Sequence, residues 1–289
     1  MNHSMINASV SMHALQQKLD LVSNNIANSN TIGYKRREAS FQDVLTSVKQ
    51  QPEGFQKEGR LTPLGYNHGW GAKLVRSETN MAQGSAVASD NPLDLAIEGN
   101  GLFELTVNSL DANGQQVQQT AWTRSGAFQL SPDPTGTGNM YLTTKDGHYV
   151  MGTDNNPVSV PANHRLVIED NGQIMAYSNE DNTAPPIAAG QIKLVRVIRP
   201  QLLLQMGENM YGLPQDTAVN REQILQTFNG ATPNDTDSIK VKQHFLEQSN
   251  VSLADEISEM LVVQRAFQLN SRAITSADTM MNIANNLRG

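Results

Sequence analysis

The stretch that decides the fold is SMINASVSMHALQQKLDLVSNNIAN, residues 4–28. It contains no Gly or Pro, and its apolar residues recur in alternating steps of three and four. This spacing places them on one narrow stripe, or seam, of an α-helix, which is typical of helices that pack along their length against other helices. Turn-forming residues follow between Asn28 and Gly33, where we expect the helix to end. The seam consists of Met5, Ala8, Met12, Leu15, Leu19, Val22 and Ile26.

The last part of the chain carries a second seam. No Gly or Pro interrupts residues 253–288, Ser252 can cap the start of a helix, and Asp255 and Glu256 fall in its first turn. We predict a helix that runs to about residue 286. Two successive steps of three around Met260 form a stutter, which locally shifts the seam. The members of this seam are Leu253, Ile257, Met260, Val263, Phe267, Asn270, Ile274, Ala277, Met281 and Ala284.

The middle of the chain has a different pattern. Short apolar alternations, such as Phe103, Leu105 and Val107, are separated by turn signals, which predicts strands joined by hairpins. The turn dipeptides are Asn113-Gly114, Asp146-Gly147 and Asn171-Gly172. The sequence therefore predicts an α+β fold, with N- and C-terminal seam-bearing helices, paired and coiled-coil-like, and a central β-rich domain.

We expect five segments along the chain. They are an N-terminal assembly helix at 1–30, a linker arm at 31–69, the central β-rich domain at 70–225, a linker at 226–252 and a C-terminal assembly helix at 253–289. Neither terminal helix can bury its seam alone. The two helices can meet each other as an antiparallel pair, or meet copies of themselves, and three or more neighbours bury a seam better than one does.

Composition excludes several classes of protein. The 289 residues include no cysteine, which rules out disulfides, zinc-thiolate sites and cysteine nucleophiles. The 21 basic and 28 acidic side chains give a net charge of −7, which argues against nucleic acid as a partner. The N-terminus lacks the basic and apolar regions of a secretory signal peptide, so we expect either a cytoplasmic protein or export by a route without a cleaved signal.

The sequence holds no pattern that predicts an enzyme, a metal site or a cofactor site. Gly99 and Gly101 form only part of a dinucleotide fingerprint, and we interpret them as a bend where two backbones approach closely. No histidine pair has metal-ligand spacing, and no serine lies in a nucleophile elbow. The basic run from Lys35 to Arg37 is expected to be a solvated turn or an ion pair between subunits.

The motifs together resemble those of the bacterial flagellar basal body rod and hook–basal body protein family. The matching segments cover nearly the whole chain in order. They are Leu19-Asp20, Val22, Asn24 to Asn28, Thr31 and Gly33 to Arg36; Asp94 to Phe103; Thr123 to Phe128; Gly207 to Tyr211; and Glu247, Ser249 to Val251, Glu256, Met260, Gln264 to Phe267, Asn270, Ser271 and Thr275. Length and a single middle domain are similar to the proximal or distal rod proteins rather than the longer hook protein.

The resemblance implies a structural subunit, exported by the flagellar type III apparatus, that polymerises through its terminal helices into the torque-transmitting shaft between motor and hook. Its partners would be copies of itself and other flagellar rod and hook proteins, with no nucleic acid and no small-molecule substrate. The alternatives are a transient cap or scaffold for rod or hook assembly, and a cell-wall hydrolase, for which no acid/base pair is visible. We expect the assembly interface to include Met12, Leu15, Leu19, Val22, Asn25, Ile26, Asn28, Leu253, Ile257, Met260, Phe267, Asn270, Ile274 and Met281.

Overall fold

The fold is described from a computed structural model of the whole chain. The structure describes residues 2–43, 47–49, 66–68, 72–110, 116–133, 138–179, 185–213, 221–228 and 239–287. These residues form two compact units. Unit 1 contains Met1–Ala27, Arg37–Glu78 and Ser252–Gly289, and unit 2 contains Asn28–Arg36 and Thr79–Val251.

The two seam-bearing helices are both present in unit 1. The first, α1, spans Asn2–Ala27, and the second, α3, spans Leu253–Asn286. Both lengths agree with the prediction from periodicity. The helices pack against each other in antiparallel directions, because Asn25 near the end of α1 meets Glu256 near the start of α3. Ser252 is the N-cap residue of α3 by position, but its hydroxyl makes no capping hydrogen bond, so that part of the prediction is wrong.

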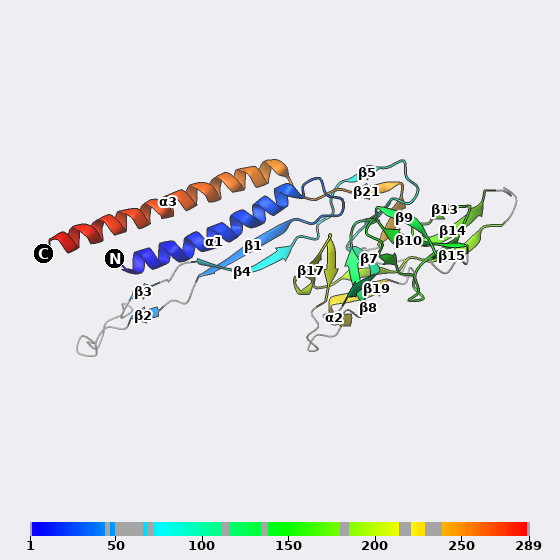
Figure 1. Cartoon of the computed structure of the whole chain (residues 1–289), viewed down its shortest axis with the longest axis horizontal. Helices are drawn as coiled ribbons and strands as arrows, with labels where there is room; N and C mark the ends of the chain where they lie inside the picture. The colour runs from blue at the N-terminus through cyan, green and yellow to red at the C-terminus, as the bar shows by residue number, and fades with distance from the viewer. Residues whose placement is uncertain are drawn as a thin grey trace, which may run out of the picture. The chain divides into compact units, whose positions relative to one another are not determined.

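Helix α1 has a second neighbour within unit 1. Strand β1 (Arg37–Asp43) contacts α1 and pairs with β4 (Ala72–Thr79) in a two-stranded sheet. In Figure 1, α1 lies between α3 and β1. Strand β2 (Ser47–Lys49) pairs antiparallel with β3 (Tyr66–His68). The described part of the expected linker arm at 31–69 therefore begins with a turn at 31–33 and continues as extended chain and the strands β1, β2 and β3, and the rest lies outside the described residues.

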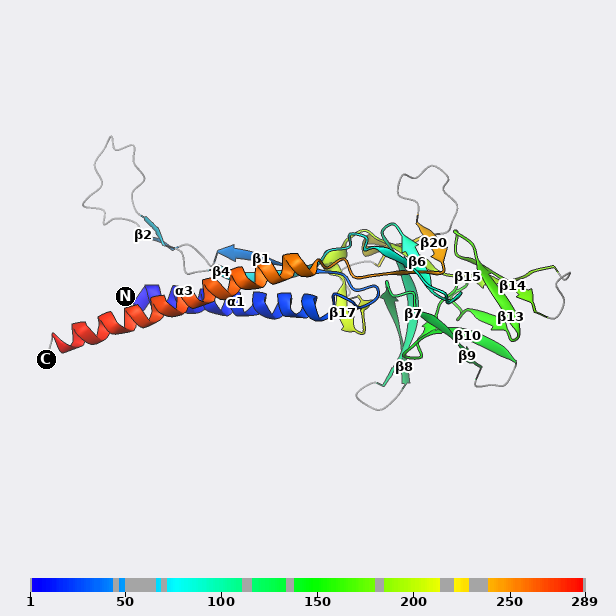
Figure 2. The same cartoon turned by 90° about the horizontal axis from the view of Figure 1, so that it is seen from above.

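Unit 2 is built on a ten-stranded sheet. Its main path runs β12, β10, β11, β7, β8, β18, β17, while β16 pairs with β7 and β19, and β9 pairs with β10. Figure 2 shows this sheet and the smaller sheet β13–β14–β15 beside it. The strands are β7 (Gly101–Leu110), β8 (Gln116–Thr123), β9 (Phe128–Pro132), β10 (Asn139–Thr144), β11 (Tyr149–Val150), β12 (Ser159–Pro161), β16 (Leu194–Val197), β17 (Leu204–Gly207), β18 (Met210–Gly212) and β19 (Leu225–Phe228).

The remaining elements of unit 2 are short. The smaller sheet consists of β13 (His164–Ile168), β14 (Gln173–Ser178) and β15 (Ile187–Gln191). Two further pairs join distant parts of the sequence, β20 (Lys240–Gln243) with β6 (Leu95–Glu98), and β21 (Phe245–Glu247) with β5 (Ala86–Ala88). A single turn of 3-10 helix at Pro200–Leu202 and a four-residue helix, α2 (Arg221–Ile224), complete the unit.

The hairpin predictions are confirmed where they can be examined. Asp146-Gly147 joins β10 to β11, and Asn171-Gly172 joins β13 to β14, both antiparallel pairs. Asn113-Gly114 lies outside the described residues. The core of unit 2 gathers apolar side chains from the ten-stranded sheet, the β13–β14–β15 sheet and the β6–β20 pair, and Phe103 packs edge-on against Phe128 with ring centroids 5.1 Å apart. The α+β architecture with a β-rich middle thus follows the sequence prediction.

Candidate assembly interface and buried ion networks

The contact between α1 and α3 includes a buried polar pair, Asn25 in the last turn of α1 and Glu256 in the first turn of α3. The Asn25 amide donates to Glu256 Oε2 at 3.2 Å and to the carbonyl oxygen of Arg37 at 2.9 Å, while its oxygen accepts from the Arg37 N–H at 3.0 Å. Glu256 has no solvent exposure. One side chain of α1 therefore holds both of the elements that flank this helix, α3 and β1.

The seam of α3 differs from the predicted one at its beginning. Leu253 and Ile257 are about half exposed, at 48% and 45%, whereas Glu256 is buried. From Glu256 the covered positions include Met260, Val263 and Phe267 of the predicted seam. A hydrophobicity pattern does not assign a carboxylate to an apolar seam, so Glu256 was missed, and here the Asn25 amide bonds that carboxylate. The assembly role of Leu253 and Ile257 stays a prediction.

Most of the other predicted interface residues are covered within unit 1. On α1, Val22 and Asn25 are buried, and on α3, Val263 and Ala277 are buried. Partial burial is shared by Met12, Leu15, Leu19, Ile26, Met260, Phe267, Asn270, Ile274 and Met281. Asn28 is also partly buried but belongs to unit 2. A second ion pair, Lys18 Nζ to Glu259 Oε1 at 2.6 Å, runs beside the seam.

Helix α3 also carries large apolar side chains that the described residues of unit 1 leave about half exposed or more. Leu253, Ile257 and Leu261 follow one another every fourth residue and are 45–50% exposed. Further along, a second group points away from α1, since its members lie about half a helical turn from the seam. This group consists of Val262, Leu269, Met280, Ile283 and Leu287, each exposed by at least 50%. We call these two sets the first and second ridges of α3.

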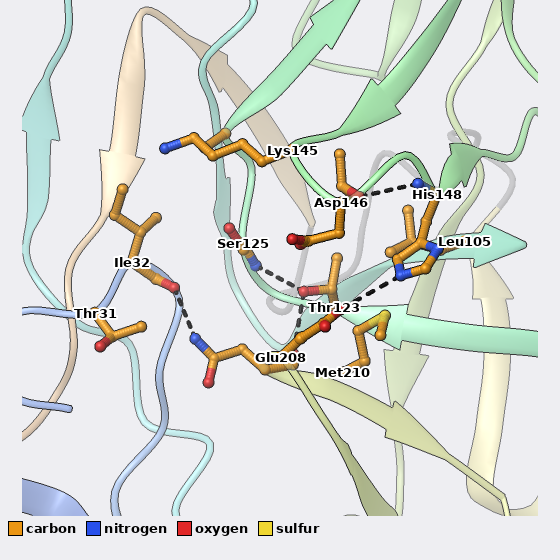
Figure 3. Close-up of a pocket in the computed structure, with 13 residues that line it drawn as sticks. Thr31, Ile32, Leu105, Thr123, Ser125, Lys145, Asp146, His148, Glu208 and Met210 are labelled. Atoms are coloured by element: carbon orange, nitrogen blue, oxygen red, sulfur yellow. Dashed lines mark hydrogen bonds and ion pairs between the residues drawn. The ribbon is translucent and has the colours of Figure 1, made fainter. Parts of the chain in front are cut away.

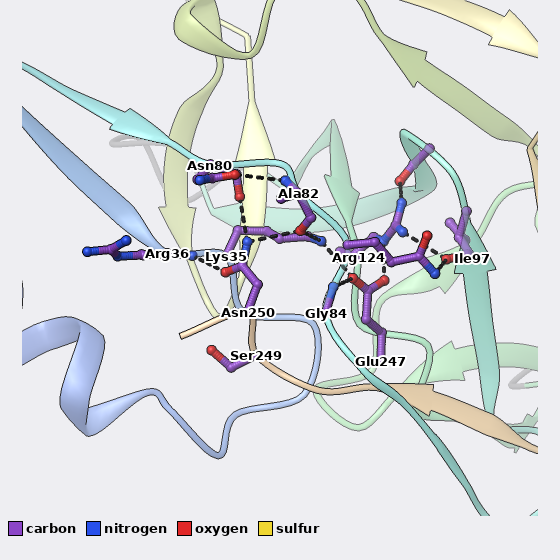
Figure 4. A network of polar contacts seen from close by, with 12 residues as sticks. Lys35, Arg36, Asn80, Ala82, Gly84, Ile97, Arg124, Glu247, Ser249 and Asn250 are labelled. Carbon is purple, nitrogen blue, oxygen red and sulfur yellow. Dashed lines mark hydrogen bonds and ion pairs between the residues drawn. The ribbon is translucent and has the colours of Figure 1, made fainter. Parts of the chain in front are cut away.

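A different polar centre lies inside unit 2, around Glu247 (Figure 4). Its carboxylate accepts from Lys35 Nζ at 2.6 Å, from Arg124 Nε at 2.5 Å and from the N–H of Gly84 at 2.8 Å. The three charged side chains are 1–2% exposed. Two buried cations thus share one buried carboxylate, and the Glu247 network carries a net positive charge.

Backbone carbonyls complete the coordination of the two cations. Arg124 donates to the carbonyl oxygens of Ile97, Gly99 and Gly101, and Lys35 donates to that of Ala82 at 2.8 Å. Burial lowers the pKa of Lys35 below its ordinary value of 10.5, the positive charge of Arg124 lowers it further, and Glu247 opposes both effects. The expectation that Lys35 belongs to a solvated turn or an intersubunit pair is wrong, because its partner lies within the same unit.

Glycines allow the chain segments around Glu247 to approach closely. Gly33, at a φ of +69°, donates its N–H to the carbonyl oxygen of Glu247 at 2.8 Å, and a Cβ there would lie 2.5 Å from the backbone nitrogen of Ser125. A Cβ on Gly126 would lie 1.7 Å from the carbonyl oxygen of Leu95. Side chains larger than hydrogen therefore do not fit at either position.

A second buried carboxylate, Glu104, forms a separate network in unit 2. It accepts from Lys193 Nζ at 2.9 Å, from Arg221 Nη2 at 2.6 Å and from the indole N–H of Trp122 at 3.2 Å. Glu104 alternates with the apolar residues Phe103 and Leu105 along β7, and no motif in the sequence indicates that it is buried. Both networks neutralise a carboxylate with two cations and one N–H donor.

The structure also contains a surface cavity of about 290 Å³ (Figure 3). His148 Nε2 lies 3.4 Å from Glu208 Oε2 at one side of it, and Ser125 lies opposite. Ser125 and His148 share no hydrogen bond, so they do not form a nucleophile–base pair. Within the described ranges no three His, Asp or Glu side chains converge as metal ligands. None of the helices in the described part of the chain is long and apolar enough to cross a membrane.

Three family models match the chain along its length. They describe a flagella basal body rod protein at residues 6–35, a flagellar hook protein FlgE/F/G D1 domain at 96–176, and a flagellar basal body rod FlgEFG protein C-terminal region at 242–287. The flagellar basal-body rod protein FlgG of Borreliella burgdorferi is 31% identical over 100% of this chain and 99% of its own. The chain belongs to the flagellar basal-body rod protein family.

Other members of the rod family show the same extent of similarity. FlgG of Caulobacter vibrioides is 31% identical over 97% of each chain, and the flagellar hook-basal body complex protein FlhP of Bacillus subtilis is 31% identical over the full length of both. As a member of this family the protein is a component of the bacterial flagellar basal body. The rod family is a family of structural proteins.

Proposed function

We propose that this chain is a structural subunit of the flagellar rod that polymerises through α1 and α3 into the torque-transmitting shaft between motor and hook. The observation that carries the proposal is the distribution of apolar residues on α3. One side of the helix packs on α1, and two further ridges remain exposed. A helix that is apolar on several sides needs several helical neighbours, and copies of the same chain supply them.

Charge distribution supports close packing of unit 1 with copies of itself. Its segments hold ten basic and ten acidic residues, so unit 1 has no net charge, whereas unit 2 holds the remaining eleven basic and eighteen acidic residues and carries the whole −7. Copies of a unit without net charge can pack side by side without the mutual repulsion that like-charged copies experience. The acidic unit 2 would then form the solvent-facing layer of the polymer.

The interface would use both the residues between α1 and α3 and the exposed ridges. Leu253 and Ile257 remain candidates for the assembly interface, because exposure in the single chain leaves them available for a neighbour. The terminal helices would be coiled-coil-like in the polymer. Of the five segments expected from the sequence, the first and last would be assembly helices, the central one the outer domain, and the other two linkers.

The same proposal covers partners and chemistry. Other rod and hook proteins would be the neighbours at either end, and the flagellar type III apparatus would export the chain. We propose no catalytic role, since each of the two buried carboxylates, Glu104 and Glu247, is neutralised by two cations and is not free to act as acid or base. No cofactor, nucleic acid or small-molecule substrate is part of the proposal.

Substitutions on the second ridge test polymerisation without altering the single chain. Leu269→Lys places a charge at a position that is 64% exposed, so the free protein should keep its melting temperature while rods fail to form. Gln201→Lys, at an exposed position in the 3-10 turn of unit 2, is the matched control and should assemble normally. Electron microscopy of basal bodies from strains carrying each variant measures the outcome.

Two results would count against the proposal. Normal rods and swimming with Leu269→Lys would show that the second ridge does not contact a neighbour. Absence of the wild-type protein from purified, completed basal bodies would favour the transient cap or scaffold instead, because a structural subunit remains in the finished rod in fixed stoichiometry.

A further inference from the structure

The chain passes between the two units four times, after Ala27, Arg36, Glu78 and Val251. At three of these crossings, the neighbouring residues of unit 2 are linked by the hydrogen bonds of one side chain. That side chain is Asn250, next to the last crossing, and its partners are Arg36, next to the second, and Asn80, next to the third.

The side-chain amide of Asn250 makes hydrogen bonds to backbone atoms both as a donor and as an acceptor. Its oxygen accepts from the Arg36 N–H at 2.6 Å, and its nitrogen donates to the carbonyl oxygens of Asn80 and Ala82, each at 2.9 Å. The Asn80 N–H in turn donates to the carbonyl oxygen of Arg36 at 2.8 Å. These bonds form a closed set across segments that are 44 and 170 residues apart in sequence.

The Glu247 network adjoins this set and holds the same three segments. Lys35 Nζ bridges the Glu247 carboxylate and the carbonyl oxygen of Ala82, which also accepts from Asn250. Glu247 itself lies three residues before Asn250, and its carboxylate accepts the Gly84 N–H. Figure 4 shows these side chains converging from the three segments. We call Lys35, Arg36, Asn80, Ala82, Glu247 and Asn250 the connection clamp.

We infer that the connection clamp is a positioning device that makes the three chain connections leave unit 2 as one mechanically coupled group, with Asn250 as the residue that couples them. Each connection alone is a single segment of chain, which bends easily. Three chain segments bonded to one another at a buried anchor share a force that is applied to any one of them. This inference rests on the proposed function in torque transmission.

The Glu104 network is a useful comparison for the connection clamp, because it is a buried ion network that holds none of the chain connections. It has the same composition as the Glu247 network, one carboxylate with two cations and one N–H donor, and it lies in the same unit. Its partners, Trp122, Lys193 and Arg221, all belong to the interior of the 79–251 segment and lie far in sequence from every crossing. Two networks of the same composition thus differ in whether they hold the connections.

Amide hydrogen exchange of the full chain tests the coupling directly. Asn250→Ala removes the acceptor of the Arg36 N–H, so that amide should exchange about tenfold faster. The Asn80 N–H and Gly84 N–H keep their own acceptors in this variant. If the segments are coupled, both should also exchange faster, by a similar factor. Asn250→Asp, which retains the acceptor for Arg36, should restore the Arg36 amide.

The matched control is Asn171→Ala, whose side chain bonds only residues 169 and 173 in the turn between β13 and β14. It should leave the amides of Arg36, Asn80 and Gly84 at wild-type rates. Acceleration of Arg36 alone in Asn250→Ala, with Asn80 and Gly84 unchanged, would overturn the inference, because it would mean that the three connections open independently.

Cells carrying the same variants test the mechanical role. Asn250→Ala should build basal bodies in normal number but swim more slowly than wild type as the viscosity of the medium rises, while Asn171→Ala follows the wild-type curve. Identical curves for both variants would contradict the mechanical role. A deletion strain with complete, rotating rods would overturn the proposed function itself, whatever the exchange rates of the clamp amides show.

Discussion

Replacement of Glu247 by Gln is the most informative perturbation of the buried charges in unit 2. Gln keeps the shape of the side chain, but Lys35 and Arg124 are then left in a site that is 1–2% exposed without a full counter-charge. Breaking a buried ion pair by removing one partner costs about 3–5 kcal/mol. For a unit of this size we expect the melting temperature of unit 2 to fall by about 6–20 °C.

Lys35→Met is the contrasting change. It removes the surplus cation and leaves Arg124 with Glu247 as a one-to-one pair, so the buried site becomes neutral. The losses are the hydrogen bonds of Lys35, each worth about 1 kcal/mol, and these are partly offset by relief of the repulsion between the two cations. We expect a smaller fall in melting temperature, below about 4 °C.

Thermal unfolding followed by near-ultraviolet circular dichroism, at pH 7 and fixed salt, measures both variants. The reasoning predicts the order wild type, Lys35→Met, Glu247→Gln. A Lys35→Met variant that melts as low as Glu247→Gln would refute it, since the cost would then follow the number of hydrogen bonds lost and not the balance of buried charge.

Three further predictions follow from particular contacts. Gly126→Ala should destabilise unit 2 strongly in urea unfolding, because a Cβ there would lie 1.7 Å from the Leu95 carbonyl oxygen, and wild-type stability would contradict that close approach. The folded-state pKa of Lys35 is lowered, so Lys35 binds fewer protons in the folded protein than in the unfolded protein. The free energy of unfolding of the wild type should therefore increase relative to that of Lys35→Met as the pH rises toward 10.5. A difference between the two proteins that stays constant with pH would contradict this. Asn25→Leu should destabilise unit 1 by about 3 kcal/mol in urea unfolding, because the Glu256 carboxylate loses its amide partner, and an unchanged midpoint would show that this bond contributes little.

The helices could be predicted from the sequence because their evidence is local. Apolar spacing fixed the type and length of α1 and α3, and Gly-containing dipeptides located two hairpins. The start of the α3 seam could not be predicted in the same way. A buried carboxylate is tolerated only when a particular amide, here Asn25, lies opposite it, and that residue is 231 positions away.

The polar centres of unit 2 were beyond prediction from spacing for the same reason. Lys35, Arg124 and Glu247 lie in three distant segments, and each alone reads as an ordinary surface charge. Their only signal in the sequence was that each lies within a motif shared with the rod family. The Glu104 network had no such partner signal, since Trp122, Lys193 and Arg221 become its neighbours only when β7, β8, β16 and α2 are assembled.

The pairing of Asn25 with Glu256 has a consequence for how the terminal helices find each other. Sliding α1 along α3 by seven residues would preserve apolar packing, because both patterns repeat at that interval. It would also separate the Glu256 carboxylate from the Asn25 amide, because the residue seven positions before Asn25 is Lys18 and the opposite slide carries Glu256 past Ala27, where α1 ends. A slide that brings Lys18 to Glu256 would also take Lys18 away from Glu259, its native partner. Each loss of about 1.4 kcal/mol corresponds to a tenfold preference for the correct alignment. A molecule that must fold among identical neighbours therefore carries, in two residues, the means to reject nearly equivalent misalignments.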